Sequence, residues 1–198
     1  MENKLRIPLH FARTMLALLL AFGLGVARAE PVVTVDTRYY DLRGATVQEL
    51  LQQKKALGPI GKDGKRYGAN TKWHVAWRYA YRNEGGRCRI DQVTTSADIV
   101  FTLPRWNPPH RAASNLRARW DRYVFALQEH ENGHRDFGIS AAREVEREIA
   151  ALPPRDNCRK MGEHANVTGR RVLDKYRALE IRYDQDTRHG ATQGAVFP

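Results

Sequence analysis

Cysteine is scarce in this sequence: only Cys88 and Cys158 occur among 198 residues. Neither has a second cysteine three positions away, which argues against the cysteine-based zinc sites of small structural domains. Beyond the N-terminal segment no stretch is apolar enough to cross a bilayer, which takes about 20 residues. Internal repeats and low-complexity segments are also absent. These absences favour one ordinary globular domain.

The N-terminal segment, residues 1–29, has the pattern of a signal peptide. Basic residues are followed by the apolar run 15–26 and then by Ala27-Arg28-Ala29, the small-x-small pattern at which signal peptidase cleaves. An uncleaved membrane anchor is the alternative, but the apolar run is shorter than a span. We therefore expect an exported protein, periplasmic or secreted, whose single domain covers residues 30–198.

Positive charge exceeds negative charge, with 33 Lys and Arg against 22 Asp and Glu. The leader holds four of the basic residues and one acidic residue, so the mature chain keeps a net charge of about +8. The basic residues are scattered, which is typical of a solvated surface. We expect envelope-associated anionic partners rather than nucleic acid.

The two cysteines favour a disulfide, because an even count in an exported chain is typical of paired cysteines. The bridge would close a loop of about 70 residues and stabilise the fold by roughly 4 kcal/mol in the chain-entropy model. Free thiols and zinc ligation are the alternatives.

Residue patterns predict strands in the first half of the mature chain. Residues 31–42 and 71–81 are rich in β-branched and aromatic residues, and 88–103 would add one or two strands. Thr46 and Glu49 form a capping box for a helix ending near Leu57. We expect a loop at 60–70, a turn at 83–87 and an irregular connector at 104–110.

The second half is predicted to be helical. Ser114 is a suitable N-cap for a helix reaching Ala150, whose apolar residues recur every three or four positions. A last helix is expected at about 168–183, followed by an irregular tail, 184–198. The fold class is α+β: a small, mostly antiparallel sheet packed against two or three helices, with a zincin-like long helix.

The long helix contains the sequence His130-Glu131-Asn132-Gly133-His134. Histidines at i and i+4 on one helix face can bind zinc together, and the intervening glutamate can act as general base on a metal-activated water. This pattern arises by chance in roughly one such chain in a hundred. A pair of core histidines is the alternative interpretation.

A catalytic zinc site usually needs a third protein ligand. The metzincin pattern would place Gly and His where Phe137 and Ser140 stand, so that subclass is excluded. Glu144 lies about 15 Å further along the helix and cannot reach the metal. The third ligand must come from another segment: a histidine (His74, His110, His164 or His189), or a carboxylate such as Glu180, which would give the gluzincin arrangement.

The chain also resembles a bacterial family of predicted secreted zinc-dependent proteases, domain of unknown function 922. The resemblance covers nearly all of residues 30–198, and its most specific parts are the HENGH helix and the closing Tyr183-Asp184, Thr187 and His189-Gly190. Other matching residues are Tyr39-Tyr40-Asp41, Gly44, Thr46, Trp73, Trp77, Leu103-Pro104 and Trp106.

The resemblance singles out His189 as the third ligand, with Glu180 and Asp184 as alternatives. Asp184 or Asp186 would then accept a hydrogen bond from a ligating histidine. Tyr183 would either stabilise the oxyanion of the reaction or belong to the core. His74 and His164 are expected to be structural.

The sequence thus predicts an exported Zn²⁺-dependent peptidase with Glu131 as general base and a protein or peptide substrate. A cell-wall amidase or another zinc hydrolase would use the same chemistry. A non-catalytic envelope-binding module is the third hypothesis, against which the glutamate beside the first histidine argues. The oligomeric state stays open.

Overall fold

The computed structural model describes residues 30–197, so the predicted signal peptide at 1–29 lies outside the described residues. In chain order the elements are β1 (Val32–Leu42), α1 (Val47–Leu57), β2 (Asn70–Glu84), β3 (Arg87–Trp106), α2 (Ser114–Ala150), α3 (Cys158–Thr187) and the short 3-10 helix η1 (Ala191–Gln193). The α+β class is therefore confirmed.

The sheet is mixed, which corrects the expectation of a mostly antiparallel one. Its strand order is β1-β3-β2, with β2 antiparallel to β3 and β1 parallel to β3. Parallel neighbours need a long connection, and here the connection consists of α1 and β2. Whether a strand is parallel or antiparallel depends on which distant segment it pairs with. The residue pattern within one strand does not predict this.

Strands β2 and β3 form one long hairpin. Its turn is made by Gly85 and Gly86, whose φ angles of +60° and +79° suit a tight two-residue turn. β3 is a single strand of 20 residues and continues through Pro104 to Trp106, so the irregular connector begins only at residue 107. Thr102 is the last residue of β3 that pairs with β2, so Pro104 lies beyond this pairing and its missing N–H removes no hydrogen bond to β2.

The helices differ from the predictions at their starts. α1 has the expected capping box between Thr46 and Glu49. Ser114 is the first helical residue of α2 rather than its N-cap; Ala113 holds that place without a side-chain hydrogen bond. α3 begins at Cys158, ten residues earlier than expected, with Asn157 as its N-cap.

Packing against the sheet explains the early start of α3. Gly162 and Asn166 are weak helix formers, but they contact aromatic side chains of β2: Tyr79 donates a hydrogen bond to the Gly162 carbonyl and Trp77 donates one to Asn166. The structure also joins Cys158 to Cys88 of β3 in a disulfide. Tertiary contacts thus stabilise a helical segment whose local sequence is unfavourable.

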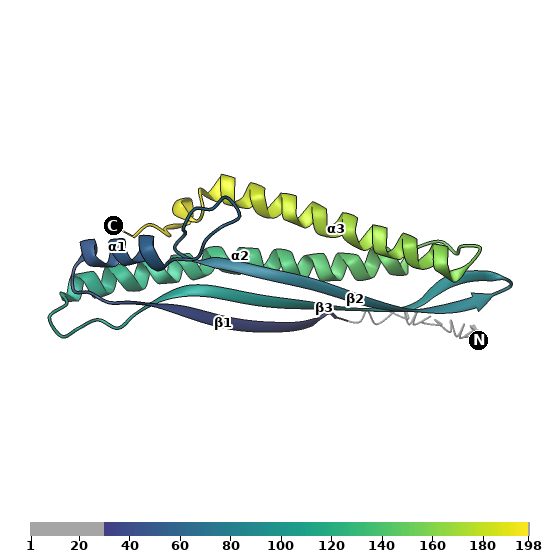
Figure 1. The fold of residues 1–198 in the computed structure, drawn as a ribbon, viewed down its shortest axis with the longest axis horizontal. Helices are drawn as coiled ribbons and strands as arrows, with labels where there is room; N and C mark the ends of the chain where they lie inside the picture. Colours follow the sequence, from purple (N-terminus) through teal and green to yellow (C-terminus); the bar gives the residue numbers. More distant parts are fainter. Residues whose placement is uncertain (1–29, 198) are drawn as a thin grey trace, which may run out of the picture.

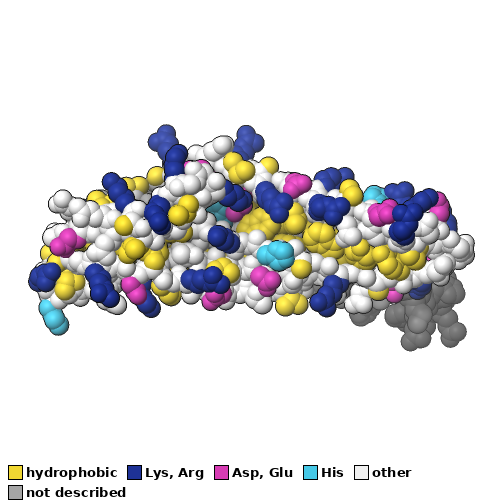
Figure 2. Space-filling view, viewed as in Figure 1, with side chains coloured by type: hydrophobic (Ala, Val, Ile, Leu, Met, Phe, Trp, Pro, Cys, Tyr) yellow, Lys and Arg dark blue, Asp and Glu magenta, His cyan; other side chains and the backbone are white. Residues whose placement is uncertain are grey.

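Helix α2 lies along one face of β2 and β3, and α3 runs back along α2 (Figure 1). Gly138 allows α2 to approach the sheet closely, since a side chain there would collide with Trp73 and crowd Ile99. None of the helices in residues 30–197 is long and apolar enough to span a membrane. The molecule is elongated, and basic side chains are spread over its visible face rather than gathered in one patch (Figure 2).

Candidate metal centre

His130 and His134 lie one turn apart on the buried face of α2. Their exposed fractions are 3% and 6%, and the two Nε2 atoms are 3.3 Å apart. Helical spacing explains this convergence, because side chains at i and i+4 project from the same face. Two imidazole nitrogens therefore point at one spot.

Helix α3 brings carboxylates to the same spot because it packs antiparallel to α2. Asp184 Oδ1 lies 3.2 Å from His130 Nε2 and 3.1 Å from His134 Nε2. One turn earlier, Glu180 Oε1 lies 3.2 Å from His134 Nδ1. Among the described residues, His130, His134 and Asp184 form a group of metal-binding side chains whose ligand atoms lie within 4.8 Å of one another.

The spacing of these three atoms fits zinc. Ligands held about 2.0–2.1 Å from the metal at tetrahedral angles lie about 3.3–3.4 Å apart, and the three separations here are 3.1, 3.2 and 3.3 Å. Two nitrogens and one carboxylate oxygen also form a donor set that zinc accepts, with room for a fourth ligand.

Oxygen acceptors lie close to the outer nitrogens of both histidines. Gln193 Oε1 lies 2.9 Å from His130 Nδ1 and is an acceptor; with a proton on Nδ1, Nε2 would be the nitrogen that binds a metal. His134 Nδ1 is buried without a hydrogen bond of good geometry, although Glu180 Oε1 is 3.2 Å away. A small shift of Glu180 would let it accept a hydrogen bond from His134 Nδ1, as Gln193 can from His130 Nδ1.

Glu131 is buried beside this cluster, with 3% of its surface exposed. The Thr71 hydroxyl of β2 donates a hydrogen bond of 2.6 Å to Glu131 Oε2. Burial raises the pKa of Glu131, opposed by the Thr71 hydrogen bond and the nearby histidines. A carboxylate with a raised pKa is suited to accept and return a proton.

Charges of opposite sign stabilise each other in the cluster. Burial lowers the pKa of His134, but the carboxylates of Asp184 and Glu180 outweigh it and raise the pKa to about 9. Burial raises the pKa of Asp184, but His130 and His134 hold it well below its usual value. Without a metal, this geometry therefore favours a proton on His134.

Tyr183 is packed into the cluster from α3. Its ring stacks on His130, with centroids 5.0 Å apart and planes 11° apart, and its hydroxyl donates to the His130 carbonyl at 3.2 Å. This position accords with the interpretation of Tyr183 as a packing residue, one of the two that the sequence left open.

His189 and Asp186 do not join the three-atom group. His189 is half exposed; its Nδ1 is 3.4 Å from Asp184 and its ring lies 4.8 Å from that of Tyr67. Asp186 is exposed on α3 and takes no part in the group. Glu144 pairs with Lys175 further along the helices, as its distance from the histidines requires.

A sequence comparison matches residues 37–190 to a family described as "Bacterial protein of unknown function (DUF922)". The chain belongs to this family. No curated protein and no solved structure matches it. The family description names no activity, so the protease activity implied by the resemblance stays a prediction.

The cluster of this DUF922 chain lies in a cleft of about 1060 Å³. One wall is the segment before and at the start of β2, including Tyr67, Asn70 and Trp73; the other is the end of α3, including Arg177 and Ile181.

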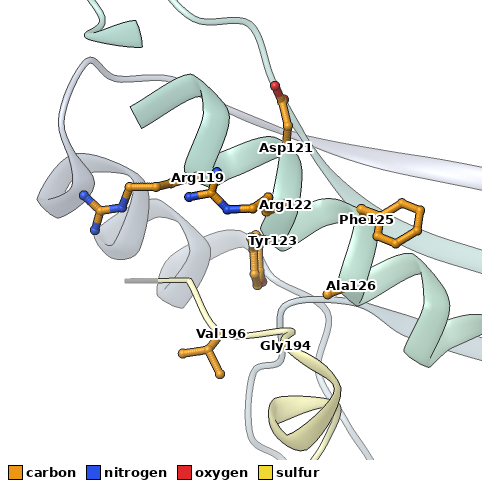
Figure 3. A pocket seen from close by; sticks show the side chains of 8 residues that line it. All are labelled: Arg119, Asp121, Arg122, Tyr123, Phe125, Ala126, Gly194 and Val196. Atoms are coloured by element: carbon orange, nitrogen blue, oxygen red, sulfur yellow. The ribbon is translucent and has the colours of Figure 1, made fainter. Parts of the chain in front are cut away.

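A second hollow of the DUF922 chain lies elsewhere, between α2 and the C-terminal tail. It is lined by Tyr123, Phe125 and Val196, among others (Figure 3). Among the described residues Asp121 is its one carboxylate, and no histidine lines it. This hollow therefore offers no metal site comparable to the histidine cluster.

Two contacts at the candidate metal centre of the DUF922 chain have little signal in the sequence. Gln193 lies in a tail that we expected to be irregular, and Thr71 is one of several polar residues of β2. The tail is in fact docked: Phe197 is buried against Trp120 and Tyr123, with ring centroids 5.4 and 5.2 Å apart. An apolar residue near the C-terminus was the one available signal of this docking.

Proposed function

We propose that this protein is a zinc-dependent peptidase in which His130, His134 and Asp184 bind the metal and Glu131 is the general base. One observation carries the proposal: the three ligand atoms form a triangle with the edge lengths of a tetrahedral zinc site. Asp184 replaces His189 as the proposed third ligand, because it supplies the third corner of that triangle.

Zinc, when bound, would polarise the scissile carbonyl and acidify a water molecule. The Glu131 carboxylate accepts the proton of the attacking water and returns it to the departing amine. Thr71 holds one oxygen of Glu131 in place by its hydrogen bond. Gln193 keeps the His130 imidazole in the tautomer that leaves Nε2 free.

The cleft beside the cluster is consistent with a peptide substrate. It has a volume of about 1060 Å³, and its lining includes the apolar side chains of Trp73 and Ile181 as well as the polar side chains of Asn70 and Arg177. An extended peptide carries an N–H and a C=O on each residue together with side chains of either kind, so it can use both kinds of contact.

The test compares zinc content and peptide hydrolysis in wild type, Glu131→Gln and Glu129→Gln. The Glu131→Gln substitution removes the proton acceptor and keeps the ligands, so bound zinc should persist while hydrolysis of a peptide library falls at least 100-fold. Glu129 is exposed on the same helix and outside the cleft, so its variant should match wild type. Undiminished hydrolysis by Glu131→Gln would contradict the proposal.

A further inference from the structure

Strand β1 lies at a free edge of the sheet. It hydrogen-bonds to β3 on one side, and within residues 30–197 no other segment pairs with its outer side. Figure 1 shows β1 along the lower border of the molecule, with no other described element beyond it. Eleven residues of strand backbone therefore present an unpaired edge.

This edge lacks several of the features by which proteins prevent strand pairing. Prolines, lysines and bulges commonly protect edge strands, and residues 32–42 contain no proline, lysine or glycine; their charged side chains are those of Asp36, Arg38 and Asp41. Val33, Val35 and Tyr39 are 38%, 54% and 52% exposed. They share the sheet face of Ala97, Ile99 and Leu103, their register partners, which are buried. The β1 part of this face is uncovered.

The sequence of β1 is complementary to itself when it is reversed about Thr37. If two copies pair antiparallel with Thr37 opposite Thr37, each Asp36 faces an Arg38 and each Val35 faces a Tyr39. Opposite charges and aromatic–aliphatic pairs directly across two strands are stabilising. Reversal about Asp36 instead would place two aspartates opposite each other, so the charges favour the Thr37 register.

We propose that β1 is a self-association surface through which two copies of this chain join their sheets by antiparallel β1–β1 pairing centred on Thr37. A two-fold contact uses the same surface on both copies, as this reversed complementarity requires. The cleft beside the start of β2 lies at the opposite edge of the sheet. Both clefts therefore stay open, and the inference does not depend on the proposed function.

A cysteine scan tests the register. The full chain is expressed so that any leader is processed, and Thr37→Cys is compared with Val32→Cys under mild oxidation. The native cysteines are already paired with each other. Facing strand residues lie about 4.5–5.5 Å apart, within disulfide reach, whereas two Val32 residues would be about 33 Å apart. Thr37→Cys should cross-link at least tenfold faster.

A charge exchange tests the specificity, with the dimer dissociation constant measured by sedimentation. Arg38→Asp places like charges opposite each other and should weaken association at least tenfold. The double variant Asp36→Arg, Arg38→Asp restores opposite charges and should recover it.

The inference would be overturned by a wild-type protein that stays monomeric at several hundred micromolar, by equal cross-linking of the two cysteine variants, or by no recovery in the double variant. Capture of a different polypeptide by β1, with no self-association, would also overturn it.

Discussion

The Tyr183 hydroxyl occupies the space in which a side chain at Gly133 would lie. A Cβ at Gly133 would collide with the Tyr183 ring and hydroxyl, and the same ring stacks on His130. The glycine of the HENGH sequence therefore lets α3 approach α2 closely enough to bring Asp184 to the histidines.

Gly133→Ala should destabilise the protein by up to about 2 kcal/mol, because an overpacking cost of about 1–3 kcal/mol outweighs the roughly 1 kcal/mol gained in helix propensity. Urea unfolding measures this free energy. The matched control is the same substitution in a Tyr183→Ala background, where the space is empty and the change should be neutral or stabilising. A cost of equal size in both backgrounds would show that Tyr183 is not the cause.

Zinc affinity distinguishes Asp184 from His189 as the third ligand. Asp184→Asn should weaken zinc binding at least 100-fold, because a ligand oxygen loses its charge. His189→Ala should change the affinity less than fivefold, since His189 is half exposed and outside the group of three. Competition with a zinc-binding dye measures both constants. The reverse order of the two effects would restore the resemblance-based assignment of His189.

Gln193 should affect zinc binding without contacting the metal. Gln193→Ala removes the acceptor of the His130 Nδ1–H and should lower zinc affinity roughly 10- to 100-fold. Gln193→Glu keeps an acceptor and should retain the affinity. Thermal unfolding of the metal-free proteins serves as the control, and a loss of affinity explained entirely by unfolding would contradict the positioning role.

The stability of the metal-free protein should fall as pH rises from about 6.5 to 9. His134 has a folded pKa of about 9 against 6.5 when unfolded, so its stabilisation is complete below pH 6.5 and is lost as pH rises through 9. Burial also raises the pKa of Glu131, and this contribution to stability has the same sign. Thermal melts in chelator measure the trend, and His134→Gln should flatten it.

The increase in melting temperature that added zinc causes should become larger as pH rises, whereas the stability of the metal-free protein falls. Zinc displaces the His134 proton, so the stabilisation that it provides should grow over pH 6.5 to 9, by at most about tenfold in affinity per pH unit. A pH-independent zinc effect would show that no proton is displaced.

The disulfide should contribute to stability but not to zinc binding at the proposed metal site. Cys88 and Cys158 join the starts of β3 and α3, whereas the histidines lie at the middle of α2. Replacing both cysteines with serine should destabilise the fold by roughly 4 kcal/mol and change zinc affinity less than threefold where the protein is still folded. A large loss of affinity would mean that the disulfide sets the position of α3 at Asp184.

The sequence was sufficient to predict those features that depend only on residues close together in the chain. The capping box at Thr46 and Glu49, the strand expected at 71–81 and the spacing of His130 and His134 each depend on residues that are close together in the sequence. Helix geometry alone makes the two imidazoles converge, so this half of the candidate site was predictable. The early part of α3 was not, because its stability comes from β2 and the disulfide.

Only the tertiary structure decided which residue completes the cluster. Asp184 and His189 are five positions apart, and both were candidates by sequence. The antiparallel packing of α3 on α2 sets Asp184 at the histidines. The chain then leaves the helix through Arg188 and His189, whose left-handed φ angles of 51° and 52° turn it back so that Gln193 reaches His130. Contacts between distant segments, including the parallel pairing of β1 with β3, determine such positions, and no local pattern encodes them.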